Sequence, residues 1–251
     1  MVNIIVCGIN GRMGKAIEDY CKNSDLYTIV AGVDVTLGVP HEFPTACSIS
    51  EIDAKADAVI DFSHHSASKS LCEYAVKTST PVIFCTTGYT EDELSLIKET
   101  SKKAPLFRSG NMSLGINLLI ELSKKAAEIL DGFDIEIIEQ HHNQKLDAPS
   151  GTALMIADGI KCVRQDSKYV YDRTQVRQKR EHTEIGIHSV RGGSIVGEHE
   201  VLFAGRNENI TLRHSALSRE VFADGALKAA AFMKGKSAGM YDMSCVLKEL
   251  M

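Results

Sequence analysis

The stretch V2-N-I-I-V-C-G-I-N-G-R-M-G14 determines how the first half of this chain folds. Its opening residues are mostly branched and apolar, which predicts a buried strand, and a helical pattern follows to about Cys21. Gly8, Gly11 and Gly14 have the spacing G-x-x-G-x-x-G, a variant of the dinucleotide-binding fingerprint. Residues without a Cβ let main-chain N–H groups approach a pyrophosphate, and the N-terminus of the next helix favours that anion. Glycines that only form a tight turn are the alternative.

An acid at the end of the second predicted strand supplies the rest of the fingerprint. The run TIVAGV at 28–33 predicts that strand, and Asp34 follows it directly. At this position a carboxylate accepts hydrogen bonds from the ribose hydroxyls of an adenosine. A 2′-phosphate would need a neighbouring cation, and residues 35–37 are uncharged, so we expect NADH as the preferred cofactor. Arg12 is close enough in sequence to reach a phosphate, which leaves NADPH open.

Two further apolar runs extend the pattern. AVIDF at 58–62 and PVIFCT at 81–86 are separated by a segment with helical periodicity. Thr90 and Glu93 form a capping box for another helix, which ends before Pro105. Apolar strands that alternate with helices are typical of a parallel sheet buried on both faces. The first half is therefore predicted to be α/β, a Rossmann-type doubly wound domain.

The pattern changes after the glycine, asparagine and serine residues at 110–115. A helix is predicted for 116–130, and apolar and polar residues alternate along 133–141, as in a strand with one solvated face. Three strand-like runs follow across short turns, at 182–193, 194–205 and 207–216. They predict an α+β region with a mixed or antiparallel sheet. From Arg219 the chain is predicted to be helical to its end.

Composition excludes several classes of protein. The chain has 251 residues, of which 44% are hydrophobic and 24% charged, which is typical of a globular protein. It has no apolar tract of the length that a bilayer requires and no leader peptide, so we expect a cytoplasmic protein without a membrane partner. A net charge of −5 argues against a nucleic-acid partner. Seven cysteines without a C-x-x-C spacing predict neither disulfides nor a thiolate zinc site.

A cationic turn follows the strand at 133–141. His141, His142 and Lys145 supply local positive charge, and a helix is predicted to begin near Ser150, where main-chain N–H groups can bind a carboxylate. A solvated lysine and an ordinary helix cap are the simpler alternatives. Adjacent histidines can also ligate a metal, but neighbours in a strand point to opposite faces and no third ligand has suitable spacing. No metal is therefore expected. The remaining histidine predictions place His64 and His65 in a loop near the cofactor, and His182, His188, His199 and His214 in strands or the core.

The segment E139-Q-H-H-N-Q-K-L-D-A-P-S-G-T-A153 closely resembles the signature of the dihydrodipicolinate reductase (4-hydroxy-tetrahydrodipicolinate reductase) family, which acts in lysine and diaminopimelate synthesis. Other blocks of that family occur in the same order at 8–14, 86–88, 111–117, 191–199 and 218–226. The resemblance extends over nearly the whole chain.

The resemblance implies two domains and a reaction. A Rossmann domain of residues 1–111 and 220–251 would be joined by two hinges to a substrate-binding and tetramerisation domain of residues 112–219. The implied enzyme is a homotetrameric oxidoreductase that uses NADH or NADPH. It would reduce 4-hydroxy-tetrahydrodipicolinate or dihydrodipicolinate, a cyclic dicarboxylate, to tetrahydrodipicolinate.

Site residues follow from the same resemblance. It implies that His141 is the general acid and Lys145 the catalytic cation. The implied substrate-binding residues are His142, Ser150, Gly151 and Thr152. The implied cofactor-binding residues are Gly8, Ile9, Asn10, Gly11, Arg12, Met13, Asp34, Cys85, Thr86, Thr87, Ser109, Gly110, Asn111 and Met112. Cys85, the segment 63–65 and the pair 109–110 depart from the usual family residues, all on the cofactor side.

Two alternatives of different kinds remain. A catalytically inactive Rossmann-type redox sensor or scaffold would keep Gly8, Gly11 and Gly14 but is expected to lose His141 or Lys145, and this chain has both sets. Another two-domain nicotinamide reductase, such as an amino-acid dehydrogenase, is disfavoured by the D-A-P-S-G-T block.

Overall fold

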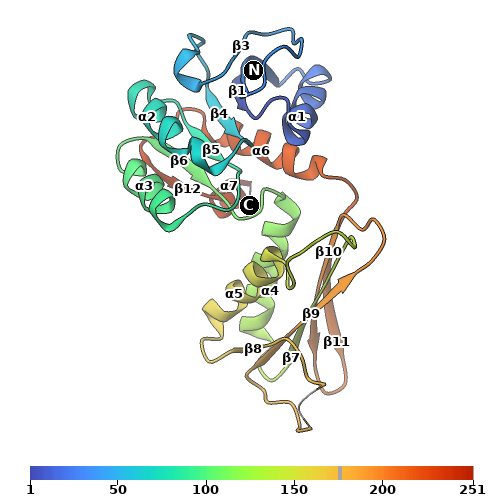
Figure 1. The fold of residues 1–251 in the computed structure, drawn as a ribbon. Coiled ribbons are helices and arrows are strands. Elements are labelled where there is room, and N and C mark those ends of the chain that lie inside the picture. Colours follow the sequence, from blue (N-terminus) through green and yellow to red (C-terminus); the bar gives the residue numbers. More distant parts are fainter. Residues whose placement is uncertain (175–176, 251) are drawn as a thin grey trace. The chain divides into compact units, whose positions relative to one another are not determined.

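The computed structural model describes residues 1–174 and 177–250 (Figure 1). The chain divides into two units, Met1–Leu114 with Glu220–Met251, and Gly115–Arg219, each with its own sheet. None of the helices in the described ranges is both long and apolar enough to cross a membrane.

The sheet of the first unit is built around β1, Val2–Cys7, which pairs in parallel with β2 on one side and β4 on the other. Seven strands, all in parallel pairs, lie in the order β12-β6-β5-β4-β1-β2-β3. The other strands are β2 Tyr27–Val33, β3 Thr45–Ala46, β4 Ala58–Asp61, β5 Val82–Phe84, β6 Pro105–Arg108 and β12 Gly239–Tyr241. The chain reverses its direction of travel across the sheet between β1 and β4, and ligands of open α/β sheets bind at the carboxyl edge of such a point.

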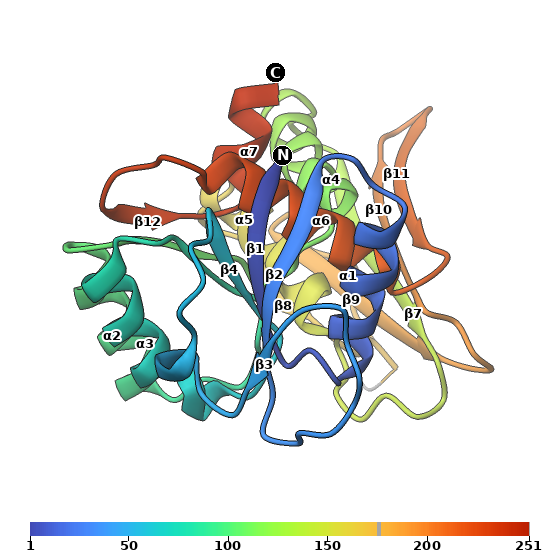
Figure 2. The ribbon, with the colours of Figure 1, turned by 90° about the horizontal axis from the view of Figure 1, so that it is seen from above.

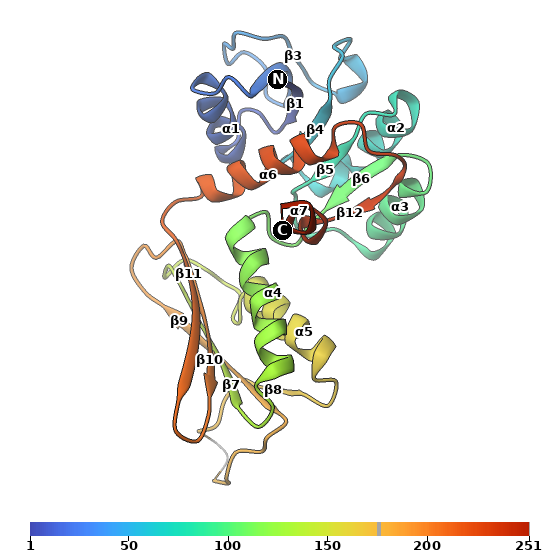
Figure 3. The same cartoon turned by 180° about the vertical axis from the view of Figure 1, so that it is seen from behind.

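Helices cover both faces of this sheet. They are α1 Arg12–Lys22, α2 Ser68–Thr78, α3 Glu91–Ser101, α6 Glu220–Met233 and α7 Met243–Leu250, with 3-10 turns at Ile49–Glu51 and His65–Ala67. Ile4 and Val6 of β1 pack in the cluster that contains α1, α6 and α7, while Ile5 and Cys7 pack with α2 and α3. Figures 2 and 3 show α6 on the other side of the sheet from α2 and α3. The predicted doubly wound α/β fold is confirmed.

Local signals were accurate at α3 and failed at the C-terminus. The Thr90 hydroxyl accepts a hydrogen bond from the N–H of Glu93, and the Glu93 carboxylate accepts one from the N–H of Thr90, so the predicted capping box is confirmed. The prediction of helix from Arg219 to the end is wrong at β12. This short strand pairs with β6, which the sequence patterns also missed. Both strands are too short to show a periodic pattern in the sequence. They form because each pairs with a neighbouring strand of the sheet, β6 with β5 and β12 with β6.

The second unit contains a five-stranded sheet in the order β11-β10-β7-β9-β8. Its strands are β7 Asp134–His141, β8 Lys168–Val170, β9 Glu184–Arg191, β10 Gly197–Ala204 and β11 Asn209–Ala216. Two helices, α4 Leu114–Ile129 and α5 Gly151–Val163, cover one face (Figure 3). Burial alternates along β7, since Ile135 and Ile137 face the helices and Glu136 and Ile138 face away. The predicted strand with one solvated face is confirmed.

The sheet of the second unit is mixed, which is one of the two arrangements, mixed or antiparallel, that the sequence predicts. β9 and β10 are consecutive in the chain but do not pair, because β7 lies between them, parallel to β9 and antiparallel to β10. Only β10 and β11 form a hairpin across a short turn. This insertion of an earlier strand brings the carboxyl end of β7 beside the amino end of β10 and the carboxyl end of β9.

Candidate active site

The glycine-rich turn between β1 and α1 is closed to side chains. Gly8 has a φ of +79°, and a Cβ there would lie 2.7 Å from the carbonyl oxygen of Phe62. A Cβ on Gly14 would lie 2.4 Å from the carbonyl oxygen of Gly8, and one on Gly11 would lie 3.1 Å from the same oxygen. Gly11 is the N-cap of α1, and no side chain of the described residues caps that helix. The turn therefore presents main chain and a helix N-terminus, which fits a pyrophosphate.

Asp34 lies directly after β2 and binds the glycine-rich turn. Its Oδ2 accepts a hydrogen bond from the N–H of Asn10 at 3.0 Å, and its Oδ1 accepts one from the N–H of Thr36 at 3.0 Å. The Asn10 amide also donates from Nδ2 to the carbonyl oxygen of Thr36, at 2.5 Å. Each carboxylate oxygen has about two acceptor positions, so Asp34 keeps capacity for ribose hydroxyls.

His41 is part of this arrangement, and the sequence patterns missed it. Its Nε2 lies 2.9 Å from Oδ1 of Asn10 and its Nδ1 lies 3.1 Å from Oε2 of Glu18, while its ring stacks on Phe43 with 5.0 Å between centroids. Because Nδ2 of Asn10 is bound to a carbonyl, its Oδ1 faces His41, so both ring nitrogens face acceptors. His41 lies in an irregular loop, so no periodicity or motif marks it.

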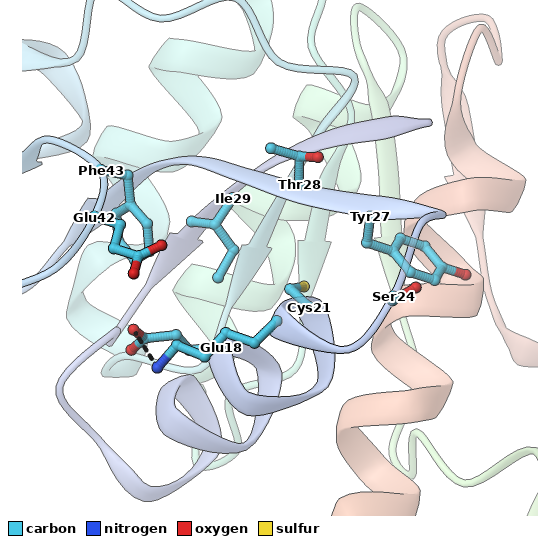
Figure 4. Close-up of a pocket in the computed structure, with 9 residues that line it drawn as sticks. Glu18, Cys21, Ser24, Tyr27, Thr28, Ile29, Glu42 and Phe43 are labelled. Carbon is cyan, nitrogen blue, oxygen red and sulfur yellow. Dashed lines mark ion pairs between the residues drawn. The ribbon is translucent and has the colours of Figure 1, made fainter.

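A groove on the first unit shares two of these residues but lies outside the predicted site. Figure 4 shows Glu18, Tyr27, Ile29 and Phe43 lining it. Lys22 also lines the groove, and its ammonium lies 3.1 Å from the Glu18 carboxylate. None of the predicted cofactor residues lines this groove. It lies along α1 and β2, away from the glycine-rich turn at the start of α1.

The other predicted residues of the glycine-rich turn differ in which of their groups can contact a cofactor. The Ile9 side chain is fully buried in the core, so only its main chain can serve a ligand. Met13 is partly buried and packs on the same core, whereas Arg12 is exposed at the first position of α1.

The Thr86 loop is held by a buried carboxylate at the end of β4. Asp61 is fully buried and accepts hydrogen bonds from the Thr86 hydroxyl at 3.1 Å and from the N–H of Ser63 at 3.0 Å. Burial raises the pKa of Asp61, and the hydrogen bonds from Ser63 and Thr86 oppose that rise. Cys85 donates its N–H to the main chain of Asp61, and burial raises the pKa of its thiol. Thr87 follows as an exposed residue.

His64 lies in the loop after β4, as predicted, whereas His65 begins the 3-10 turn that His64 caps. Nδ1 of His65 lies 2.9 Å from the Glu93 carboxylate, and the His64 side chain accepts a hydrogen bond from the N–H of Ser66. These contacts tie the histidines to the start of α3 and to the 3-10 turn.

The turn at 109–112 packs against α6. The Ser109 hydroxyl donates to the carbonyl oxygen of Asn111 at 2.8 Å, and Gly110 is exposed. Met112 is buried, and a Cβ on Gly225 of α6 would lie 1.7 Å from its carbonyl oxygen. The glycine of α6 therefore allows the helix to contact this turn.

In the second unit, predicted site residues lie at the carboxyl end of β7, on the face that α4 and α5 cover. The apolar inner face of that strand ends at Ile137, and Glu139 and His141 continue the same row. Glu139 is fully buried and His141 is 8% exposed. Oε2 of Glu139 lies 2.5 Å from Nδ1 of His141, and both its oxygens accept hydrogen bonds from Arg191.

The protonation of Glu139 follows from these contacts. Burial by itself would raise the pKa of Glu139, but hydrogen bonds from His141 and Arg191 outweigh it and hold the pKa well below its usual range. Glu139 and Arg191 were absent from the predicted site. Glu139 was detectable, because residues i and i+2 of a strand share a face, whereas Arg191 is distant in the sequence.

The start of α5 lies beside this pair. Ser150 is the N-cap, as predicted, and its hydroxyl accepts a hydrogen bond from the N–H of Ala153 at 3.1 Å. Its own N–H donates to Oε1 of Glu139 at 3.1 Å. Gly151 and Thr152 form the first turn, and a Cβ on Gly151 would meet no atom within 4 Å. The helix start therefore faces open space at Gly151.

Lys145 and His142 lie in the turn between β7 and α5. The Lys145 ammonium is 2.9 Å from the Asp147 carboxylate, and its side chain is 22% exposed. That hydrogen bond lowers the pKa of Asp147. His142 follows the end of β7 and is half-buried, unlike His141 inside the strand. Among residues 1–174 and 177–250, no group of three His, Cys, Asp or Glu side chains is placed to hold a metal.

His199 on β10 completes the inner face. It is 3% exposed, its Nε2 lies 3.1 Å from the Ser150 hydroxyl, and its ring meets that of His141 edge-on at 5.2 Å. Burial, reinforced by the nearby His141, lowers the pKa of His199 to about 3, so the ring is neutral near pH 7. The core placement predicted for His199 is confirmed. His182 differs from its prediction, because it lies in the exposed turn before β9.

Comparison with known proteins agrees with this arrangement. Residues 2–112 match the family model described as dihydrodipicolinate reductase, N-terminus, and residues 115–247 match the model described as dihydrodipicolinate reductase, C-terminus. The chain belongs to the dihydrodipicolinate reductase family. The resemblance found in the sequence blocks is thus confirmed over both units.

Relatives of high identity carry the name of one enzyme. The chain is 52% identical over 250 residues to the 4-hydroxy-tetrahydrodipicolinate reductase of Caldanaerobacter subterraneus subsp. tengcongensis, which covers 99% of both chains. It is 51% identical over 249 residues to the reductase of the same name from Clostridium tetani, which covers 98% of this chain and 97% of that one. The catalytically inactive alternative gains no support from these relatives.

A solved structure supports the dihydrodipicolinate reductase fold. The dipicolinate-bound dihydrodipicolinate reductase from Paenisporosarcina sp. TG-14 aligns with a TM-score of 0.79 over 96% of this chain and 97% of that chain. The sequence identity is 24%, so this likeness concerns the fold.

Proposed function

We propose that this chain uses a nicotinamide cofactor to reduce 4-hydroxy-tetrahydrodipicolinate, or the dihydrodipicolinate formed from it, to tetrahydrodipicolinate in lysine and diaminopimelate synthesis. Family membership across both units supports this assignment. The observation that best supports it is the position of His141, whose Nδ1 lies within hydrogen-bond distance of the buried Glu139 carboxylate, beside the start of α5. A histidine held in this way is suited to protonate a reaction intermediate.

The first unit is proposed to bind the dinucleotide. The turn from Gly8 to Met13 would hold the pyrophosphate and Asp34 the adenosine ribose, while the Thr86 loop and the turn at 109–112 would hold the nicotinamide side. Residues 35–37 carry no cation, which favours NADH over NADPH. Arg12 is an exposed cation of the glycine-rich turn, and it keeps some use of NADPH open.

The second unit is proposed to bind the two carboxylates of the substrate. The first turn of α5, at Gly151 and Thr152, would hold one, because the main-chain N–H groups and the dipole at a helix N-terminus favour an anion there. His142 and Lys145 would hold the other. The Asp147 carboxylate that now pairs with Lys145 keeps the ammonium in place without removing its other two donors.

The proposed chemistry assigns a proton to His141. The cofactor, when bound, supplies a hydride to the conjugated imine. The added electrons leave an enamine, whose carbon must take up a proton. His141 in its imidazolium form donates that proton, and the Lys145 ammonium stabilises the electron-rich intermediate.

The assembly and location of the protein are also proposals. The family resemblance implies an oligomer, and we propose a homotetramer formed through the second unit. All described cysteines are free thiols, which suits a cytoplasmic protein.

The test is an NADH-oxidation assay of the purified chain with precursor generated enzymatically in the same cuvette. We expect loss of NADH absorbance that depends on the precursor. His141→Gln should bind NADH as the parent does and lower kcat by roughly 10²–10⁴. Oxidation no faster than without precursor would contradict the proposed function, and unchanged turnover of His141→Gln would contradict the role of His141.

A further inference from the structure

We propose that Glu139 is a positioning residue that keeps the proton of His141 on Nδ1, so that Nε2 is the atom that transfers a proton to the substrate. The inference rests on the proposed function for its catalytic meaning, but the tautomer it specifies can be measured without any reaction.

Donors from Ser150, Arg191 and His141 bind the two oxygens of Glu139, and the Ser189 side chain on the neighbouring strand also hydrogen-bonds this carboxylate. Oε1 accepts from the N–H of Ser150 at 3.1 Å and from Nη2 of Arg191 at 2.7 Å. Oε2 faces Nδ1 of His141 at 2.5 Å and accepts from Nη1 of Arg191 at 2.8 Å. The side chain has no exposed surface, so water does not compete for it. A fully buried carboxylate with this many donors is ionised, and it can only accept.

The tautomer of His141 follows from that acceptor. Since the neighbouring oxygen has no proton to give, Nδ1 must carry one. When His141 donates a proton, the Nε2–H bond breaks and a C–H bond forms on the substrate, while Nε2 keeps the electron pair. The neutral ring that remains has its proton on Nδ1, which is the form that Glu139 already binds. The ring then regains a proton from solvent.

Gly197 keeps space at the other nitrogen. It lies opposite His141 at the start of β10, and a Cβ there would lie 3.1 Å from Nε2 and 3.4 Å from Cδ2 of His141. Any side chain would therefore crowd the nitrogen that transfers the proton. Arg191 and Gly197 both belong to the R-G-G-S-I-V-G-E-H block, to which the sequence patterns assigned no role.

The same carboxylate also fixes the proposed anion site. Oε1 of Glu139 holds the N–H of Ser150, the residue that caps α5, while the Ser150 hydroxyl contacts Nε2 of His199. One buried group therefore sets the position of the proton donor relative to the first turn of α5.

The decisive variant is Glu139→Gln, because its shape is conserved and its amide must choose an orientation. At the Oε1 position both partners, Ser150 N–H and Arg191, can only donate. At the Oε2 position His141 can become an acceptor by moving its proton to Nε2. The Ser189 hydroxyl, which also hydrogen-bonds this carboxylate, is the other group that can accept, so the variant is made and compared in a Ser189→Ala background. The amide NH₂ should therefore face His141 and impose the other tautomer.

Nitrogen-15 NMR of histidine-labelled protein reads the tautomer directly. We expect Nδ1–H in the neutral ring of the parent and Nε2–H in Glu139→Gln. In the assay, kcat should fall by roughly 10²–10⁴, as when a carboxylate that orients a catalytic histidine becomes an amide. The Kd for NADH should be unchanged.

Glu136→Gln is the matched control. Glu136 lies on the opposite face of the same strand and also contacts an arginine and a histidine, Arg180 at 3.0 Å and His188 at 2.8 Å. It should leave the His141 resonances unchanged and kcat within about twofold.

Two outcomes would overturn the proposal. The first is that the neutral His141 ring of the parent protein carries its proton on Nε2. This result would contradict the proposal even if Glu139→Gln does not fold or the chain has no reductase activity. A large loss of kcat in Glu139→Gln with His141 still protonated on Nδ1 would show that Glu139 only supports the structure.

Discussion

The N–H of Asn10 lies 3.0 Å from Oδ2 of Asp34, so the carboxylate proposed to bind the adenosine ribose already holds the glycine-rich turn. The two residues are 24 positions apart and belong to the two segments that would enclose the adenosine. Asp34 therefore has two functions that a substitution removes together: it orders the turn, and it offers acceptors to the cofactor. Its contribution to NADH binding should exceed that of the ribose contacts alone.

We expect Asp34→Ala to raise the Kd for NADH by roughly 10- to 100-fold, since hydrogen bonds to a charged group are worth about 1.5–3 kcal/mol. It should also reduce the preference of the parent for NADH over NADPH, measured as the ratio of kcat/KM values. Asp25→Ala, an exposed residue before β2, should change neither. A parent enzyme that prefers NADPH would show that Arg12 or another cation outweighs Asp34.

His41→Phe should weaken NADH binding by roughly 5- to 10-fold, the worth of about one net hydrogen bond. The ring can still stack on Phe43, but Asn10 loses the partner that orients its amide. Isothermal titration of the purified variant measures the effect. His182→Phe, an exposed histidine of the second unit, is the control. Equal affinities in both variants would mean that Asn10 keeps its position without His41.

The two carboxylate anchors of the second unit predict a difference between two inhibitors. Pyridine-2,6-dicarboxylate should compete with the substrate, and pyridine-2-carboxylate should bind much more weakly, because it leaves one anchor unpaired. Lys145→Met should remove most of the advantage of the dicarboxylate and little NADH affinity. Competition assays of both compounds on both proteins decide this. Equal inhibition of the parent by the two compounds would show that the site binds only one carboxylate, which would contradict the second anchor.

His199 predicts how stability depends on pH. Its pKa is about 3 in the folded chain, below the value of about 6.5 expected when unfolded, so the unfolded state binds more protons between these values. Stability should therefore fall as the pH is lowered through 6.5. Between pH 7 and pH 5 this group alone should lower the free energy of unfolding by about 2 kcal/mol.

Urea unfolding of the parent and of His199→Gln at both pH values measures that contribution. The amide can keep a hydrogen bond to the Ser150 hydroxyl but does not titrate, so the variant should lose less stability on acidification. An identical loss in both proteins would assign the acid sensitivity between pH 7 and pH 5 to other groups, such as His214, whose pKa burial also lowers and which lies opposite His199 on β11.

Sequence alone determined the features that depend on neighbouring residues. Gly8, Gly11 and Gly14 predicted the turn because only residues without a Cβ fit it, and Thr90 with Glu93 predicted the start of α3 because the capping contacts are three residues apart. Alternation along β7 predicted that Ile135 and Ile137 share the buried face of the strand. Each of these follows from the covalent geometry of one short segment.

Only the tertiary structure decided which distant residues meet. Arg191 binds Glu139 across 52 positions and His199 meets Ser150 across 49, both because β7 lies between β9 and β10. The pairing of β12 with β6 and the contact of His41 with Asn10 depend likewise on the folded chain. Local periodicity states that a strand or a polar face exists, but not its neighbour, because that choice depends on the packing of the whole sheet and its helices. Arg191 and His199, which lie near the proposed proton donor, therefore could not be predicted from local sequence, whereas Glu139 lies two residues from it on the same face of β7.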